Sequence, residues 1–405
     1  LFKVNFMKKV FLFVIAATAF FVTYAQSDVE TADPKLKKDK ELSDKLKTEE
    51  ARKNDTNFTI LKTVAATSVK NQGMTGTCWC FSTTSLIESQ CLKSNLGEFD
   101  LSEMFSVRNT YLEKGRNYVL RQGSTQFGEG GLGHDLINAI AKYGAVPDSA
   151  YSGLKPGGFT VHDHGRLVQK LKNYLDTLLK HKPVQEDWLT GYEKILNDEL
   201  GVPPAKFKYN GKEYTPKTFA AEVLKFNADD YLYITSFTHH PYYSSFILEV
   251  PDNFSNGAYY NVPVEDMIEL TKETVNNGYS ILWDADVSND GFQQKMGSAV
   301  NFNNFTPELK RKGDLFTGQS KEGKWDVTTR QKLFENLTTQ DDHLMHITGL
   351  AKSKAGNNFF MVKNSWGDVG PRHGYIYVSE AYFAINTVSM IIPKAALSKK
   401  MLEKI

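Results

Sequence analysis

The chain has 405 residues, with 48 basic and 47 acidic side chains and a formal net charge of +1. This length is enough for one large or two modest domains with a hydrophobic core. The balanced charge creates no overall field that would attract nucleic acid, so we expect no nucleic-acid partner. The three cysteines (Cys78, Cys80 and Cys91) are an odd, clustered set and therefore no disulfide framework.

The first residues have the pattern of a secretory signal. A basic start, Met7-Lys8-Lys9, is followed by an apolar run at 10–22 and by Thr23-Tyr24-Ala25, which suits a cleavage site. The run is shorter than the roughly 20 residues that a membrane-spanning helix needs. We therefore expect a signal peptide at 1–25, with 1–6 upstream of the true start. This predicts export to the periplasm or the extracellular space, without stable membrane insertion after signal removal; a retained anchor is the alternative.

Residues 26–57 are charged and poor in apolar side chains. This composition is typical of a solvated helix or of a tether. Residues 59–69 then have the character of a short extended segment that leads into the cysteines. We treat 26–57 as a separate charged N-terminal segment.

The stretch 71–82 combines Gln72, two glycines and Cys78 at the start of an apolar run that suits a helix. A thiol in the first helical turn lies at the positive end of the helix dipole, which favours the nucleophilic thiolate. The side-chain amide of Gln72 can donate to an oxyanion beside the sulfur. The pattern therefore predicts a nucleophilic cysteine, with a buried structural cysteine in a glycine-rich turn as the alternative.

The same stretch resembles the motif Q-G-x-x-G-x-C-W-x-F-S of papain-like cysteine peptidases. The matching residues are Gln72, Gly73, Gly76, Cys78, Trp79, Phe81 and Ser82. The resemblance implies an α+β, two-lobed fold with the active site in a cleft between a helical lobe and a β-barrel-like lobe. It also implies that Cys78 is the nucleophile and that Gln72 contributes to the oxyanion site. Thr75 stands where the family often has a disulfide-forming cysteine.

Downstream, Ser102 is expected to cap a helix, and a second helix is expected from about 134 to 142, ending at Tyr143-Gly144. Before that second helix lies the loop 128–131, which is rich in glycine. The resemblance implies that Gly130 and Gly131 of this loop bind the main chain of the substrate; a plain tight turn is the alternative.

Residues 157–262 interrupt the papain-like pattern, and we expect them to form a largely helical insertion. Leucines at helical spacing from 167 to 179 and the stretch 188–200 predict two helices, whereas 231–250 is aromatic and rich in strand-forming residues. His239-His240 in this part suggests metal binding, but no carboxylate or cysteine stands at ligand spacing, so we predict a surface or packing role and no metal. The insertion resembles that of the bleomycin hydrolase and aminopeptidase C branch. A further helix is expected to open at Pro263 and to close at Gly278.

Two histidines compete as the partner of the thiol. The resemblance selects His343, which precedes Gly349 by six residues, over His346; on a strand the two side chains point to opposite faces. The segment 359–367 has the character of a buried strand that ends in Asn-Ser-Trp-Gly. Asn364 can orient the imidazole, and Trp366 can shield that hydrogen bond from water.

The sequence therefore predicts a cysteine peptidase that hydrolyses peptides through a Cys78-His343-Asn364 triad and a thioester acyl-enzyme, without a cofactor. Its predicted parts are a signal at 1–25, a charged segment at 26–57, a helical lobe at 58–156, an insertion at 157–262, a β lobe at 263–394 and a basic tail at 395–405.

Three alternatives remain: a strict aminopeptidase of the bleomycin hydrolase type, a catalytically silent papain-like binding protein, and a metal-binding protein that uses Cys78, Cys80 and the histidines. The resemblance implies that the branch reads the free amine of the substrate with a C-terminal arm, which the tail at 395–405 does not resemble. We therefore expect acetylated peptides to be cut at least as well as free ones. An oligomer is compatible with the resemblance but is not predicted firmly by any residue.

Overall fold

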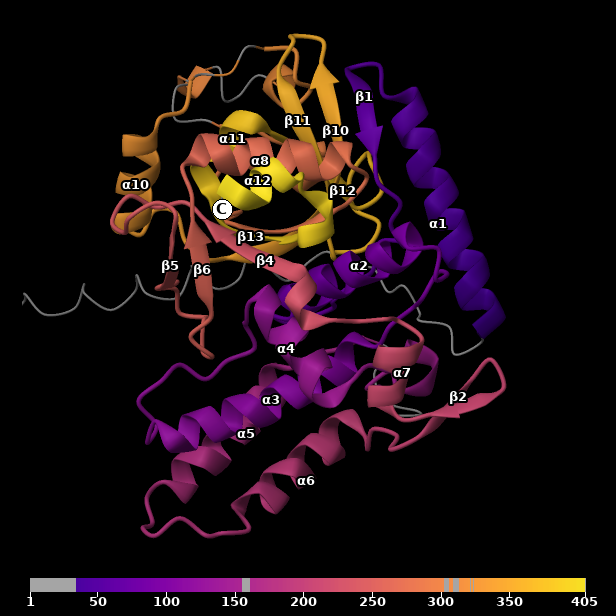
Figure 1. The fold of residues 1–405 in the computed structure, drawn as a ribbon, viewed down its shortest axis with the longest axis vertical. Helices are drawn as coiled ribbons and strands as arrows, with labels where there is room; N and C mark the ends of the chain where they lie inside the picture. Colours follow the sequence, from indigo (N-terminus) through magenta and orange to yellow (C-terminus); the bar gives the residue numbers. More distant parts are fainter. Residues whose placement is uncertain are drawn as a thin grey trace, which may run out of the picture.

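The computed structural model describes residues 34–154, 161–301, 306–308, 313–320, 322 and 324–404. The strands of the large sheet and the helices packed beside them form one lobe, a group of helices forms the other, and α2 and α4 lie between the two (Figure 1). The predicted α+β character is confirmed. The expected signal at 1–25 lies outside the described residues. Among the described helices, none combines the length and the apolar character that crossing a membrane requires.

The helical lobe follows the predicted elements closely. Its helices α2 to α4 are Cys78–Lys93, Glu103–Leu120 and Gly133–Tyr143, and α5 to α7 are Gly165–Leu178, Trp188–Leu200 and Pro216–Glu222. Ser102 caps α3 by accepting from the Phe105 N–H at 3.0 Å, as predicted from the sequence. A two-stranded hairpin of β2 and β3 stands beside α7 (Phe207–Tyr209 and Lys212–Tyr214).

The second lobe is built on one sheet, which has eleven strands within the described residues. The strand order is β5-β6-β4-β13-β7-β10-β11-β12-β9-β8, and β1 pairs with β10 outside this path. The strands are β1 (Phe58–Thr63), β4 (Tyr231–Thr235), β5 (Ser244–Ile247), β6 (Ala258–Asn261), β7 (Ile281–Ala285), β8 (Phe292–Gln293), β9 (Ser298–Ala299), β10 (His343–Ser353), β11 (Asn358–Lys363), β12 (Tyr375–Ser379) and β13 (Thr387–Pro393). Helices α8, α10, α11 and α12 accompany them (Val264–Asn276, Val327–Glu335, Glu380–Asn386 and Lys399–Lys404).

The sheet takes strands from three of the sequence ranges. Strand β1 comes from 58–156, and β4 to β6 come from 157–262, the range of the predicted insertion. The first half of that range is helical, whereas its second half extends the sheet. The insertion is thus part of both lobes.

The charged segment before β1 is helical. Helix α1 (Pro34–Asn54) runs along one side of the molecule (Figure 1). Lys37 forms ion pairs with Asp100, at 2.7 Å, and with Asp148. Immediately after the helix, Asp55 pairs with Arg372 at 2.6 Å. Because these contacts are polar and not apolar, α1 is attached to the body through its charges.

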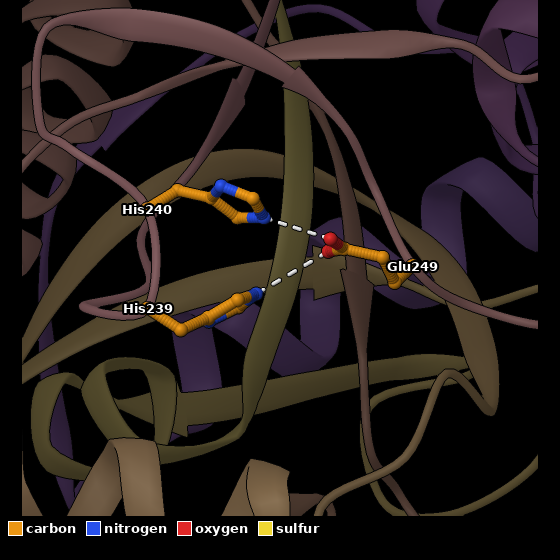
Figure 2. A group of neighbouring side chains, drawn as sticks. All are labelled: His239, His240 and Glu249. Atoms are coloured by element: carbon orange, nitrogen blue, oxygen red, sulfur yellow. Dashed lines mark hydrogen bonds and ion pairs between the residues drawn. The ribbon is translucent and has the colours of Figure 1, made fainter.

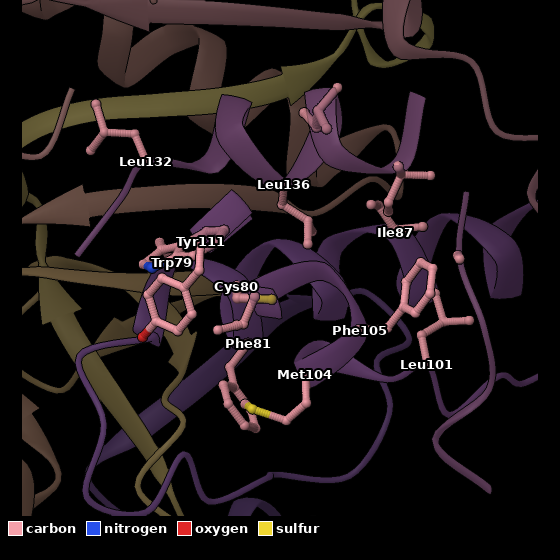
Figure 3. Close-up of a cluster of buried hydrophobic side chains, with 14 of the residues drawn as sticks. Trp79, Cys80, Phe81, Ile87, Leu101, Met104, Phe105, Tyr111, Leu132 and Leu136 are labelled. Carbon is pink, nitrogen blue, oxygen red and sulfur yellow. The ribbon is translucent and has the colours of Figure 1, made fainter. Parts of the chain in front are cut away.

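Helix α2 is the central element. Thirteen of its 16 residues are buried, since it packs against α3 and α4 on one side and against β7 and β10 on the other. Figure 3 shows Trp79, Cys80 and Phe81 within the cluster of apolar side chains that fills the helical lobe. A helix that is buried on every side holds its first residue, Cys78, in a fixed place between the lobes.

The close contact between the end of α4 and the start of α7 can be tested at Gly144. Gly144 has φ +84°, and a Cβ there would lie 2.2 Å from the carbonyl carbon of Pro216. Gly201 ends α6 with a similar φ of +78° and has open space around it. Both Gly→Ala variants carry the backbone strain, so we expect Gly144→Ala to lose about 1–3 kcal/mol more of unfolding free energy than Gly201→Ala, measured in urea. Equal losses would contradict the close approach of α4 and α7.

Candidate active site

The predicted site residues come from the start of a helix and the ends of two strands. Cys78 is the first residue of α2, His343 is the first residue of β10, and Asn364 directly follows β11. Because α2 packs on β10, the helix start faces the beginning of that strand. The backbone N–H of Leu344, next to His343, approaches the sulfur of Cys78.

The imidazole of His343 is held by Asn364 and covered by Trp366. His343 Nε2 lies 2.7 Å from Asn364 Oδ1, and the ring centroids of His343 and Trp366 are 4.6 Å apart. An amide oxygen can only accept, so Nε2 carries the hydrogen and Nδ1 of the neutral ring keeps its lone pair. Asn364 is itself fixed, because its Nδ2 donates to Gln294 Oε1 at 3.0 Å.

The second histidine of the segment points elsewhere. His346 Nδ1 lies 2.9 Å from the hydroxyl of Ser85, on α2, and Lys363 Nζ donates to the same hydroxyl at 2.8 Å. His346 is 1% exposed and belongs to the packing between α2 and the sheet. The structure therefore brings His343, and not His346, to Asn364 and Trp366.

Gln72 is positioned by the other lobe. Its backbone N–H donates to the Ser365 carbonyl at 2.8 Å, and its Oε1 accepts from the Ser365 hydroxyl at 2.7 Å. Its Nε2 donates one hydrogen to the Thr75 carbonyl at 2.6 Å. A side-chain amide has two such hydrogens, so one of them remains for a group at the helix start.

The loop with Gly130 and Gly131 is attached to the beginning of α2. Trp79 Nε1 donates to the Glu129 carbonyl at 3.0 Å, and a Cβ on Gly131 would lie 3.1 Å from the Trp79 ring. A Cβ on Gly130 would come within 1.8 Å of the carboxylate of Asp252. Asp252, from the connection between β5 and β6, therefore covers the backbone that the resemblance assigns to substrate binding.

Burial keeps both reactive groups neutral in this closed site. It raises the pKa of Cys78 to about 12, and the nearby Asp341, Asp284 and Asp252 act in the same direction, whereas the Leu344 N–H opposes it. Burial also lowers the pKa of His343 to about 4, against the hydrogen bond to Asn364. The resting site therefore favours a thiol and an imidazole over an ion pair.

Two carboxyl groups, one buried and one half-buried, lie near the cysteine. Asp284 of β7 is 1% exposed, and burial is the main cause that raises its pKa to about 7. It shares a hydrogen bond with Asp341, whose pKa is also raised by burial and by the charge of Asp284. Ser389 donates to Asp284 Oδ2 at 2.9 Å. The two carboxyl groups therefore share a proton at neutral pH.

The histidine pair of the insertion corrects one expectation. Figure 2 shows both imidazoles directed at Glu249, with His240 Nε2 at 2.7 Å and His239 Nε2 at 3.2 Å from its carboxylate. Glu249 is nine residues after His240, so the sequence alone gave no sign of a carboxylate at ligand spacing. The turn of the chain around β5 brings Glu249 to the two imidazoles. The three ligand atoms lie within 4.8 Å of one another, as in a metal site.

The surrounding hydrogen bonds nevertheless favour a polar cluster over a metal site. Gln331 Oε1 accepts from the Thr238 N–H at 2.6 Å, and its Nε2 donates to Glu335 at 3.0 Å, which fixes the orientation of the amide. The same Nε2 donates to His239 Nδ1 at 3.0 Å. The neutral His239 ring then carries its hydrogen on Nε2. A metal ion could bind this atom only if it carried no hydrogen.

Sequence reasoning missed four residues around the site: Gln294, Ser365, Asp284 and Asp341. Ser365 lies inside the Asn-Ser-Trp-Gly motif, so its position was available as a signal. Asp284 lies in β7 after an apolar run, and Asp341 lies two residues before β10; the available signal was a charged residue beside an apolar run. Gln294 has no such signal, because a turn between short strands brings it to Asn364.

Fold and site together define a papain-like cysteine peptidase. The model of the Peptidase C1-like family matches residues 19–405, and the chain belongs to this family. It is therefore a cysteine-type peptidase, a hydrolase.

Individual relatives narrow the comparison. The chain is 23% identical over 383 residues to aminopeptidase C of Listeria monocytogenes, covering 84% of this chain and 83% of the relative. It is 22% identical over 390 residues to human bleomycin hydrolase, covering 82% of each. The crystal structure of PepW from Lactobacillus rhamnosis superposes with a TM-score of 0.68 at 21% identity, covering 88% of this chain and 86% of PepW. The predicted resemblance to the bleomycin hydrolase and aminopeptidase C branch is confirmed.

The buried acid pair predicts an unusual pH dependence of stability. The folded protein keeps the Asp284 proton up to a pKa of about 7, whereas an unfolded aspartate loses it near the ordinary value of 3.8. The folded state thus binds more protons in this window, and stability falls as the pH rises through it. We expect Asp284→Asn to stabilise the protein by roughly 2–4 kcal/mol at pH 8 and to have little effect at pH 4.

Thermal unfolding at both pH values measures this difference. The exposed Asp290→Asn is the control for a surface charge and should change stability little at either pH. A stability loss in Asp284→Asn at pH 8 would mean that the pair contributes to folding as an ionised group.

Proposed function

We propose that Cys78, His343 and Asn364 form the catalytic triad of this peptidase and that its substrates are peptides or oligopeptides. The observation that carries the proposal is the 2.7 Å hydrogen bond between His343 and Asn364 beneath Trp366, at the start of the helix that begins with Cys78. This bond leaves His343 Nδ1 as the base on the side of the sulfur. Gln72 and the Cys78 backbone N–H supply the donors for an oxyanion.

The reaction follows from these roles. His343 Nδ1 takes the thiol proton as the sulfur attacks the peptide carbonyl, and the positive end of α2 and the Leu344 N–H stabilise the forming charge. The imidazolium then gives its proton to the leaving amine, which produces a thioester. Water activated by His343 releases the acyl group. All groups come from the chain, so no cofactor takes part.

A strict aminopeptidase is the second candidate, and the relatives favour it. Those named aminopeptidase C and bleomycin hydrolase align with more than four fifths of this chain. The catalytically silent alternative is disfavoured because the residues for each chemical role are present together. Export through the N-terminal signal, to the periplasm or the extracellular space, belongs to this proposal and rests on residues 1–25 alone.

Replacing Cys78 tests the nucleophile. We expect Cys78→Ala to abolish peptide hydrolysis with an unchanged fold, because only its sulfur attacks. The matched control is Cys80→Ala, since Cys80 is wholly buried and its thiol donates to the Glu103 carbonyl. It should keep most of the activity, measured as kcat/KM on a fluorogenic peptide. Comparable losses in both variants would indicate a role shared by the two thiols, such as metal binding.

Replacing the two histidines tests the choice of base. We expect His343→Ala to lower kcat by about 10³-fold or more, and the double variant with Cys78→Ala to be no worse than either single variant. His346→Ala removes a packing contact with Ser85 and should lower kcat by less than about tenfold. Equal damage at His346 would reverse the assignment.

A further inference from the structure

Three carboxyl groups from three segments lie around the start of α2, where Cys78 stands. Asp284 is the cross-strand partner of Leu344, the residue whose N–H approaches the sulfur. Asp341 precedes His343 by two residues, and Asp252 lies over Gly130. His343 and Leu344 begin the strand that meets Cys78, and the loop with Gly130 is attached to Trp79, so the three carboxyl groups lie around the start of α2.

The pair at the centre of this group lacks donors. Asp284 is 99% buried, and within the described parts of the chain no N–H or O–H donates to Asp284 Oδ1 or to Asp341 Oδ2. Another buried acid, Glu88 of α2, has a donor for each oxygen: Oε2 accepts from the Thr67 hydroxyl at 2.6 Å and Oε1 from the Leu101 N–H at 2.9 Å. Burial alone therefore does not explain why Asp284 and Asp341 each keep an oxygen without a donor.

Such a pair does not help the chain to fold. Burying a carboxyl group without enough donors costs stability, and a second carboxyl group beside it adds repulsion when both ionise. Groups that destabilise the fold and stand in an active site are commonly retained for function. A cationic group with several N–H donors would suit these acceptors.

We propose that Asp284 and Asp341, with Asp252 at the entrance, bind the α-ammonium group of the substrate's N-terminal residue. The inference rests on the proposed function, because it places the ammonium beside the carbonyl that Cys78 attacks. An α-ammonium is attached to the carbon next to that carbonyl, so any group that binds it must lie close to the sulfur. An ammonium has three donors, which suit the oxygens left without one.

Asp252 supports the choice of the α-ammonium over a lysine side chain. Its carboxylate occupies the face of Gly130, where further residues of a longer substrate would run. It also accepts from Gln126 at 3.1 Å, so it is held at this place. If the substrate has only one residue before the scissile bond, its α-ammonium group lies beside these carboxylates. These carboxylates are thus the amine-binding group that the sequence did not reveal. We therefore expect acetylated peptides to be cut more slowly than free ones, the reverse of the expectation from the sequence.

The test compares alanyl-aminomethylcoumarin with its N-acetyl form on four proteins: the unaltered chain, Asp284→Asn, Asp341→Asn and Asp342→Asn. We expect the unaltered chain to prefer the free amine by more than about tenfold in kcat/KM, which is about 1.4 kcal/mol of transition-state binding. Each of the first two variants should reduce this preference to below about threefold while still cleaving the acetylated substrate. Asp342 is the matched control, because it is exposed and accepts from the Val287 N–H at 3.2 Å; its variant should keep the preference.

The outcomes separate the two proposals. Equal rates on free and acetylated substrates in the unaltered chain, or a preference that survives both Asp284→Asn and Asp341→Asn, would overturn this inference and leave the triad intact. Acetyl-lysyl-aminomethylcoumarin is the third substrate; if it is preferred over the acetyl-alanyl form and the preference depends on Asp284, the pocket binds a side chain and the α-ammonium assignment is wrong. Absence of hydrolysis on every substrate would instead overturn the proposed function.

Discussion

The contact between the start of α2 and the start of β10 is the constraint on which the site depends. Helix α2 is buried between the two lobes, so it cannot shift without disturbing the apolar cluster that it shares with the helical lobe and with strands of the sheet. Its first residue is the nucleophile, and the strand it meets begins with the base. Core packing thus fixes the positions of Cys78 and His343. The hydrogen bond from the His343 ring to Asn364, which is itself held by Gln294, fixes the orientation of the imidazole.

The same burial that positions the groups also opposes their charges. It holds the pKa of Cys78 high and that of His343 low, so the resting site is neutral and the charge arises during reaction. The aspartates beside the sulfur add to the cost of a thiolate. A substrate ammonium bound between them would neutralise that field, which couples recognition of the substrate to activation of the nucleophile.

Much of the fold was predictable because its signals are local. The helix Trp188–Leu200 shows helical spacing and ends at Gly201, and Ser102 and Gly144 mark helix ends with residues suited to those conformations. The residues that reach the site from a neighbouring strand or across a turn were not predictable. Asp284 reaches the site through its register with Leu344, and Glu249 reaches His239 and His240 through a turn. Such pairings depend on strand register and on the course of a turn, which periodicity does not encode.

The role of Cys78 can be tested most directly with a thiol-reactive peptidyl epoxide, followed by mass spectrometry of the labelled peptide. All three cysteines are buried, but only Cys78 lies at a helix start facing a histidine that can take its proton. We expect one label per chain, on Cys78, and a loss of hydrolysis in proportion to labelling. The His343→Ala variant should not be labelled. Labelling on Cys80 or Cys91, or full activity after Cys78 is modified, would contradict it.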